Sequence, residues 1–179
     1  LLEHVQVVTL FWGQAWEGAP LRDHLNGFFQ ALFDDGRYLA QLSQYSAGGY
    51  QIGNGQIIAT ATDPAQLPAR VTDQQIQAEL IAQIAAGALP APGTDYLYVV
   101  FTPAGVVVDN GWGETSDKDF LGYHSYAEDP QGDWAPYIAA PTPTDTMLQN
   151  MKLSWGIQNV ADGMTQAVSH ELAEAITDP

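Results

Sequence analysis

Apolar residues fall into short runs and helical stripes along the N-terminal third of the chain. Residues 5–12 (VQVVTLFW) are rich in β-branched and aromatic side chains and predict a buried strand. Residues 39–45 predict a further helical turn or two. Between these two segments, apolar positions recur at helical spacing and predict an amphipathic helix with an aromatic face; they are Leu21, Leu25, Phe28, Phe29, Leu32 and Phe33.

The middle of the chain repeats this alternation. Residues 56–61 (QIIATA) predict a second strand, and Thr72 or Asp73 can cap a second helix. Residues 95–103 (DYLYVVFTP) form the most convincing strand, and residues 106–108 are a candidate partner for it.

The C-terminal part contains two further predicted strands and a long helical region. The strands are residues 120–127 and 134–140, which lie in an otherwise irregular stretch. The helical region then runs to about Ile176 without an internal proline, and Gly156 and Gly163 are candidate break points.

The alternating order of strands and helices indicates one α/β domain over residues 1–179. We expect a layered fold with a mixed sheet and a site on the C-terminal helix. No linker is long enough to divide the chain. The first residues lack a basic start and a small-residue cleavage site. The chain is therefore consistent with a mature fragment whose leader has been removed, and with a C-terminus shortened at Pro179.

Charge removes several classes of partner. The chain has 5 Lys+Arg against 21 Asp+Glu, a formal net charge of −16, and its basic residues are scattered. Nucleic acid and anionic membranes both require clustered positive charge. Such an acidic surface suits a secreted protein or one that binds divalent cations. Because the chain has no cysteine, a disulfide scaffold, thiolate catalysis and Cys-ligated zinc are also excluded.

The segment that carries chemistry is His170-Glu171-Leu172-Ala173-Glu174. On a helix, His170 and Glu174 lie one turn apart on the same face. In the His-Glu-x-x-His metallopeptidase helix, two ligands occupy these positions and the intervening Glu polarises a metal-bound water. Since zinc also accepts carboxylate oxygen, we predict His170 and Glu174 as metal ligands and Glu171 as the general base. The alternative is an ordinary surface pair, worth about 0.2–0.5 kcal/mol.

The rest of this helix is also patterned. Gly163 and Ala167 precede His170 and Glu174 on one side, and leave room there for a ligand or for a closely packed helix. The opposite side is a predicted core stripe of Val160, Met164, Val168, Leu172 and Ile176.

A catalytic zinc normally takes three protein ligands and a water, so one ligand is missing. The candidates are His124 on a predicted strand, a residue beyond Pro179, and, less favoured, Asp178. Because a following proline disfavours helical geometry, Asp178 suits a cap or turn better. Tyr123 and Tyr126 flank His124, and a tyrosine there can stabilise a developing oxyanion. The alternative for His124 is a purely structural hydrogen bond.

Two resemblances follow from these residues. Residues 170–174 look like the zinc helix of the zincin metallopeptidases, with Glu replacing the second His. The wider chain resembles the Exordium, or phosphate-induced, family of secreted proteins and its bacterial relatives. The matching pieces are residues 8–13 (VTLFWG) with the following helix, 96–103, 122–125 (GYHS), and 162–164 leading to 177–179.

The Exordium resemblance implies an extracellular protein, since the plant members are associated with cell-wall expansion and growth signalling. Those members lack a His-Glu pair on this helix, so a peptidase activity rests on His170, Glu171 and Glu174 alone. The leading hypothesis is a secreted zinc metallohydrolase, a peptidase acting on peptides or proteins. The alternative is a non-enzymatic, wall-associated interaction protein whose His-Glu segment is a structural helix or structural metal site.

A third hypothesis is a calcium-stabilised carbohydrate-binding module. Carboxylates in an irregular stretch are candidate calcium ligands, although their spacing matches no EF-hand loop; they are Asp117, Asp119, Glu128, Asp129 and Asp133. Trp112, Trp134 and Tyr137 are candidates for lining a sugar or peptide cleft, with core packing as the alternative.

Overall fold

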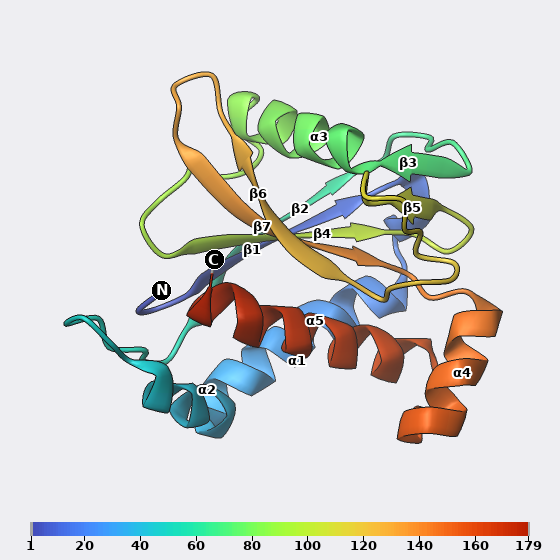
Figure 1. Ribbon diagram of the computed structural model, residues 1–179. Coiled ribbons are helices and arrows are strands. Elements are labelled where there is room, and N and C mark those ends of the chain that lie inside the picture. Colours follow the sequence, from blue (N-terminus) through green and yellow to red (C-terminus); the bar gives the residue numbers. More distant parts are fainter. Residues whose placement is uncertain (1, 179) are drawn as a thin grey trace.

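Five strands form one mixed sheet in the computed structural model, which describes residues 2–178 (Figure 1). β1, β2, β4 and β7 run parallel, and the edge strand β6 runs antiparallel to β7. The predicted α/β fold with a mixed sheet is confirmed. Across the sheet the strands are β2 (Gln56–Asp63), β1 (Gln6–Trp12), β4 (Tyr96–Thr102), β7 (Trp134–Pro141) and β6 (Tyr123–Glu128).

Helices cover both faces of this sheet. Figure 1 shows α1 and α5 beneath the sheet and α3 above it, where a small two-stranded sheet of β3 and β5 adjoins α3. Short 3₁₀ helices cover Gln14–Trp16 and Ser43–Tyr45. None of the helices in residues 2–178 is long and apolar enough to span a membrane. The remaining elements are α1 (Pro20–Asp35), α2 (Arg37–Leu42), β3 (Arg70–Thr72), α3 (Asp73–Ala85), β5 (Val107–Asp109), α4 (Asp145–Trp155) and α5 (Val160–Thr177).

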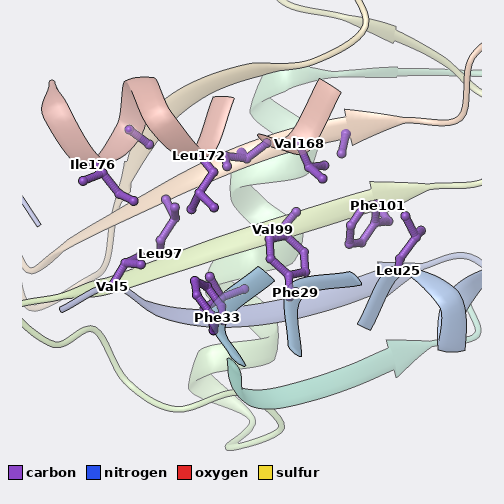
Figure 2. Close-up of a cluster of buried hydrophobic side chains, with 14 of the residues drawn as sticks. Val5, Leu25, Phe29, Phe33, Leu97, Val99, Phe101, Val168, Leu172 and Ile176 are labelled. Atoms are coloured by element: carbon purple, nitrogen blue, oxygen red, sulfur yellow. The ribbon is translucent and has the colours of Figure 1, made fainter. Parts of the chain in front are cut away.

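The core between the sheet, α1 and α5 fixes the helix that carries the candidate site. In Figure 2, Phe29 and Phe33 of α1 face Leu172 of α5 across side chains of the sheet. The predicted stripe on α5 is confirmed, because Met164, Val168, Leu172 and Ile176 are buried and Val160 packs against the same cluster. Each such burial stabilises the fold by about 1.5–3 kcal/mol, so the stripe holds α5 in one rotational setting.

A second core lies between the sheet and α3, where Ile76 and Leu80 pack on strand residues such as Val100. Of the two predicted caps, Thr72 is the one used. Its side chain accepts from the backbone N–H of Gln75, whose own side chain accepts from the Thr72 backbone, a reciprocal capping box.

The expected partner of residues 106–108 is different in the structure. β5 pairs in parallel with β3 rather than with β4. The reason is that β4 is a central strand, already hydrogen-bonded to β1 on one side and β7 on the other. A turn in which the Val106 N–H donates to Pro103 O takes the chain away from the main sheet.

The last helical region is divided at one of the two predicted glycines. Gly156 adopts a left-handed conformation, φ 72°, and caps α4. Gly163 lies inside α5 instead, where an added Cβ would come 3.4 Å from Met151 Sδ of α4. At Gly163 the small side chain therefore serves close helix packing.

Candidate metal centre

β6 places His124 on the side of the sheet that faces α5. Successive side chains of a strand point to opposite faces. Tyr123 belongs to the α3-side core, whereas Ile138, which lies opposite His124 on β7, belongs to the α5-side core. His124 therefore points toward α5.

On α5, Glu171 and Glu174 meet this imidazole. His124 Nδ1 lies 3.1 Å from Glu171 Oε2 and 3.6 Å from Glu174 Oε2. One ligand atom from each of the three residues lies within 4.8 Å of the others, so the group can hold a metal ion. It is the one such group of His, Asp and Glu side chains within residues 2–178.

Burial differs sharply among the three side chains. Glu171 is 11% exposed, His124 27% and Glu174 49%. A buried carboxylate is costly unless a hydrogen-bond donor or cation compensates it. His124 provides that donor when Nδ1 carries the proton, and a divalent cation can take the place of that proton.

Gly122 allows Glu171 to approach the sheet. A Cβ on residue 122 would come 3.2 Å from Glu171 Cγ and 3.3 Å from the Ala139 carbonyl oxygen. Both contacts are tight, so the absence of a side chain keeps this space open for Glu171. The sequence resemblance included residue 122, but the sequence alone gave no reason for a glycine there.

His170 contacts the group from its exposed side. Its Nε2 lies 3.2 Å from Glu174 Oε1, which confirms the predicted contact at i, i+4, but the His170 side chain is 67% exposed. The sequence predicted His170 as a ligand and Glu171 as the base. In the structure, Glu171 rather than His170 lies with Glu174 and His124 in the three-residue group. At about 100° per residue, Glu174 projects between the two, about 40° from His170 and about 60° from Glu171. His124 approaches on the buried, Glu171 side.

The other candidate third ligands lie elsewhere. Asp178 is the C-cap of α5 with non-helical angles, φ −149° and ψ 69°, and is not a member of the group. A residue beyond Pro179 lies outside the described residues. His124 is thus the candidate that the fold brings to the two glutamates.

The two tyrosines beside His124 differ. The Tyr123 hydroxyl donates to Asp73 Oδ1 at 2.6 Å on the α3 side, so the expected oxyanion role is wrong for Tyr123. Tyr126, two residues from His124, lies on the α5 side and is 48% exposed.

Asp73 organises a second polar cluster on the opposite face of the sheet. It accepts hydrogen bonds from Tyr123, Tyr137 and the Gln77 side chain. Burial, reinforced by these bonds to the carboxylate, raises the pKa of both tyrosines. Tyr137, expected as a candidate cleft residue, is fully buried, whereas Trp112 and Trp134 are exposed.

Two of the acidic residues proposed for calcium accept backbone hydrogen bonds within turns or loops. Asp129 Oδ1 accepts from the backbone N–H of Gln131 at 2.9 Å and of Asp133 at 2.8 Å, in the β6–β7 turn. Asp119 accepts from the Thr115 N–H at 2.8 Å. Within residues 2–178 these carboxylates do not form a group with metal-ligand spacing.

A cavity of about 350 Å³ adjoins the candidate metal centre. His170 and Glu171 line it on one side, and Phe120, Met147 and Trp155 line it elsewhere. Sequence reasoning missed these three residues, because they come from a loop and from α4 and no common spacing links them to residues 170–174. Through this cavity a small molecule can reach Glu171.

Comparison of the chain with protein-family models, with curated proteins and with solved structures finds no match. The centre formed by His124, Glu171 and Glu174 is therefore interpreted from its own geometry.

Proposed function

We propose that this protein is a secreted zinc-dependent hydrolase that cleaves peptide bonds. The observation that carries the proposal is the meeting of His124 from β6 with Glu171 and Glu174 from α5 beside a cavity. The acidic surface, with a formal net charge of −16, supports the extracellular part of the proposal.

The donor set fits zinc. Catalytic zinc sites use imidazole nitrogen and carboxylate oxygen, with three protein ligands and one open position. Glu174 is 49% exposed and the cavity reaches Glu171, which leaves the solvent side accessible. Calcium prefers six to eight oxygen ligands, so a set that includes an imidazole suits it less well. Mn, Co and Fe accept the same donors, and the choice among them is a matter for measurement.

A zinc ion bound here would lower the pKa of a coordinated water and polarise a carbonyl group. The chain must then supply a proton acceptor. In one arrangement Glu171 is the base, and the exposed His170 turns inward to join His124 and Glu174 as a ligand. In the other, Glu171 remains a ligand and His170 takes the proton. Both arrangements use the 3.2 Å contact between His170 and Glu174, which keeps the imidazole beside the site.

A Glu171→Gln variant tests the proposal and separates the two arrangements. Zinc content and casein hydrolysis are measured on wild type and variant after zinc loading. If Glu171 is the base, the variant keeps zinc and loses at least about 100-fold in rate, within the usual contribution of general-base catalysis. If Glu171 is a ligand, the variant loses both. A wild type that binds no zinc, or binds it without hydrolysing casein, contradicts the proposal.

The second candidate is a non-enzymatic extracellular protein with a structural metal site. It is favoured by the largely buried contact between His124 and Glu171, which ties the edge strand β6 to α5. In that case zinc raises the melting temperature of the wild type, and the zinc-loaded protein hydrolyses no peptide.

A further inference from the structure

We propose that the cavity beside the metal centre selects peptides with a bulky apolar side chain next to the cleaved bond. This inference rests on the proposed function and names its substrate class. The cavity, of about 350 Å³, falls in the size range of ligand pockets, about 300–1,000 Å³.

Most of the cavity lining away from the metal centre is apolar, with Asp119 and Gln166 as the polar exceptions. Phe120 and Leu121 come from the loop before β6, Met147 and Trp155 from α4, and Ala167 from α5. Met147 is buried and Trp155 is 59% exposed, so the indole is the more accessible of the two apolar groups. Such a surface favours an aliphatic or aromatic side chain over a charged or sugar group.

The cavity extends to the two candidate proton acceptors. His170 and Glu171 line the same space as Trp155 and Met147. A side chain held by the apolar wall therefore places the adjoining backbone at the two candidate proton acceptors. Asp119, the remaining charged lining residue, already accepts a hydrogen bond from the Thr115 N–H.

A second apolar surface lies on the other side of His124. Tyr126 stacks on Trp134 with ring centroids 4.1 Å apart and an interplanar angle of 19°, and both rings are about half exposed. Gly122, which lines the cavity, precedes His124 by two residues, and Tyr126 follows it by two. A ligand that touches both surfaces must carry apolar groups on either side of a polar linkage, as an extended peptide does.

The net charge of the chain adds a further selection. With a formal charge of −16, the protein repels acidic peptides, attracts basic ones and leaves neutral ones unaffected. The substrate class is therefore a neutral or basic peptide with a leucine- or phenylalanine-sized residue at the cleaved bond.

The test uses peptides of one length that differ at a single position, with Leu, Phe, Gly or Asp there. For the zinc-loaded wild type we expect kcat/KM at least about 10-fold higher for Leu and Phe than for Gly, as apolar pockets usually discriminate. Trp155→Ala reduces this ratio. The matched control is Trp112→Ala, because Trp112 is 71% exposed and does not line the cavity.

A binding measurement separates this inference from the proposed function. Calorimetry with the zinc-free protein measures the affinity for the same peptides. Tighter binding of the Leu and Phe peptides, lost in Trp155→Ala, supports the pocket even if no peptide is hydrolysed. Hydrolysis without a preference for Leu or Phe overturns the pocket and retains the hydrolase. The absence of both preferential binding and preferential hydrolysis also overturns the inference.

Discussion

His124 Nδ1 and Glu171 Oε2 lie 3.1 Å apart although the two residues are 47 positions apart in the chain. One residue belongs to β6 and the other to α5, so their contact exists only when the edge of the sheet and the helix are packed together. Under the proposed function, metal affinity at this point would therefore report on the assembled fold.

The first prediction concerns His124. His124→Ala removes the one imidazole of the three-residue group. Loss of a residue that only supports a ligand typically weakens metal binding about 10- to 100-fold, and we expect zinc affinity to fall by more than that. Isothermal titration with zinc measures the affinity, and metal content after dialysis checks the stoichiometry.

The control for this experiment is His24→Ala, since His24 is exposed on α1 and belongs to no ligand group within residues 2–178. Wild type with zinc at 100 times its Kd should be stabilised by about 2.7 kcal/mol, and the His24 variant equally. Equal zinc affinity in His124→Ala and wild type would remove His124 from the centre.

The second prediction concerns the space that Gly122 leaves. In Gly122→Ala the new Cβ would lie 3.2 Å from Glu171 Cγ and 3.3 Å from the Ala139 carbonyl oxygen. We expect Glu171 to be displaced from His124, with weaker zinc binding and a loss of about 1–3 kcal/mol in the free energy of unfolding, as for other overpacked sites.

Gly27→Ala is the matched control, because Gly27 lies on the exposed side of α1 and an added Cβ meets nothing within 4 Å. That variant should gain about 0.5–1 kcal/mol from helix propensity and leave zinc affinity unchanged. Urea unfolding and zinc titration of both variants provide the comparison. Unchanged zinc affinity in Gly122→Ala would show that Glu171 does not depend on this gap.

The sequence was most informative where a local pattern and a tertiary constraint coincide. The period of the stripe on α5 predicted which side is buried, and the same period placed Glu174 beside His170. The pairing of strands could not be predicted from such local patterns. The run at residues 106–108 looks like a partner for β4, but only the sheet order shows that β4 is already paired on both sides.

Roles within the centre depended on the same kind of information. The spacing along α5 places His170, Glu171 and Glu174 close together. Which of His170 and Glu171 faces His124 depends on the side of α5 on which β6 packs. The alternation along β6 likewise sends Tyr123 to Asp73 and His124 to α5. A strand register of this kind follows from packing on both faces of the sheet, which no short motif records.

The third prediction concerns Asp73, the acceptor for two largely buried tyrosine hydroxyls. In Asp73→Ala, Tyr123 and Tyr137 lose that acceptor, and α3 loses an acidic residue from its first turn. We expect the free energy of unfolding to fall by about 2–4 kcal/mol from the unsatisfied hydroxyls and the helix dipole together.

Asp145→Ala is the matched control for this variant. Asp145 follows the N-cap Thr144 of α4 as Asp73 follows Thr72 of α3, but it is exposed. Its removal should cost only the dipole contribution, about 0.3–1 kcal/mol. Equal losses in the two variants would show that the bonds to the tyrosines do not stabilise the fold.

The fourth prediction concerns stability at high pH. Burial and the bonds to Asp73 raise the pKa of Tyr123 and Tyr137 above that of an unfolded-state tyrosine, about 10. Above pH 10 the unfolded chain therefore releases tyrosine protons that the folded chain keeps, and the free energy of unfolding decreases as pH rises. Below pH 10 the folded and unfolded states both keep these protons, so the two tyrosines do not make the free energy of unfolding depend on pH.

Urea unfolding between pH 8 and 11.5 measures this slope. Tyr123→Phe should show a shallower decrease above pH 10 than wild type, because one of the raised groups is gone. Tyr98, whose pKa burial also raises, remains in both proteins and keeps part of the slope. Tyr50→Phe removes a tyrosine that is 55% exposed and serves as the control. If Tyr123→Phe loses stability with pH as steeply as wild type and Tyr50→Phe, then the Tyr123 phenol ionises as readily in the folded protein as in the unfolded chain, and the buried bond to Asp73 does not hold its proton.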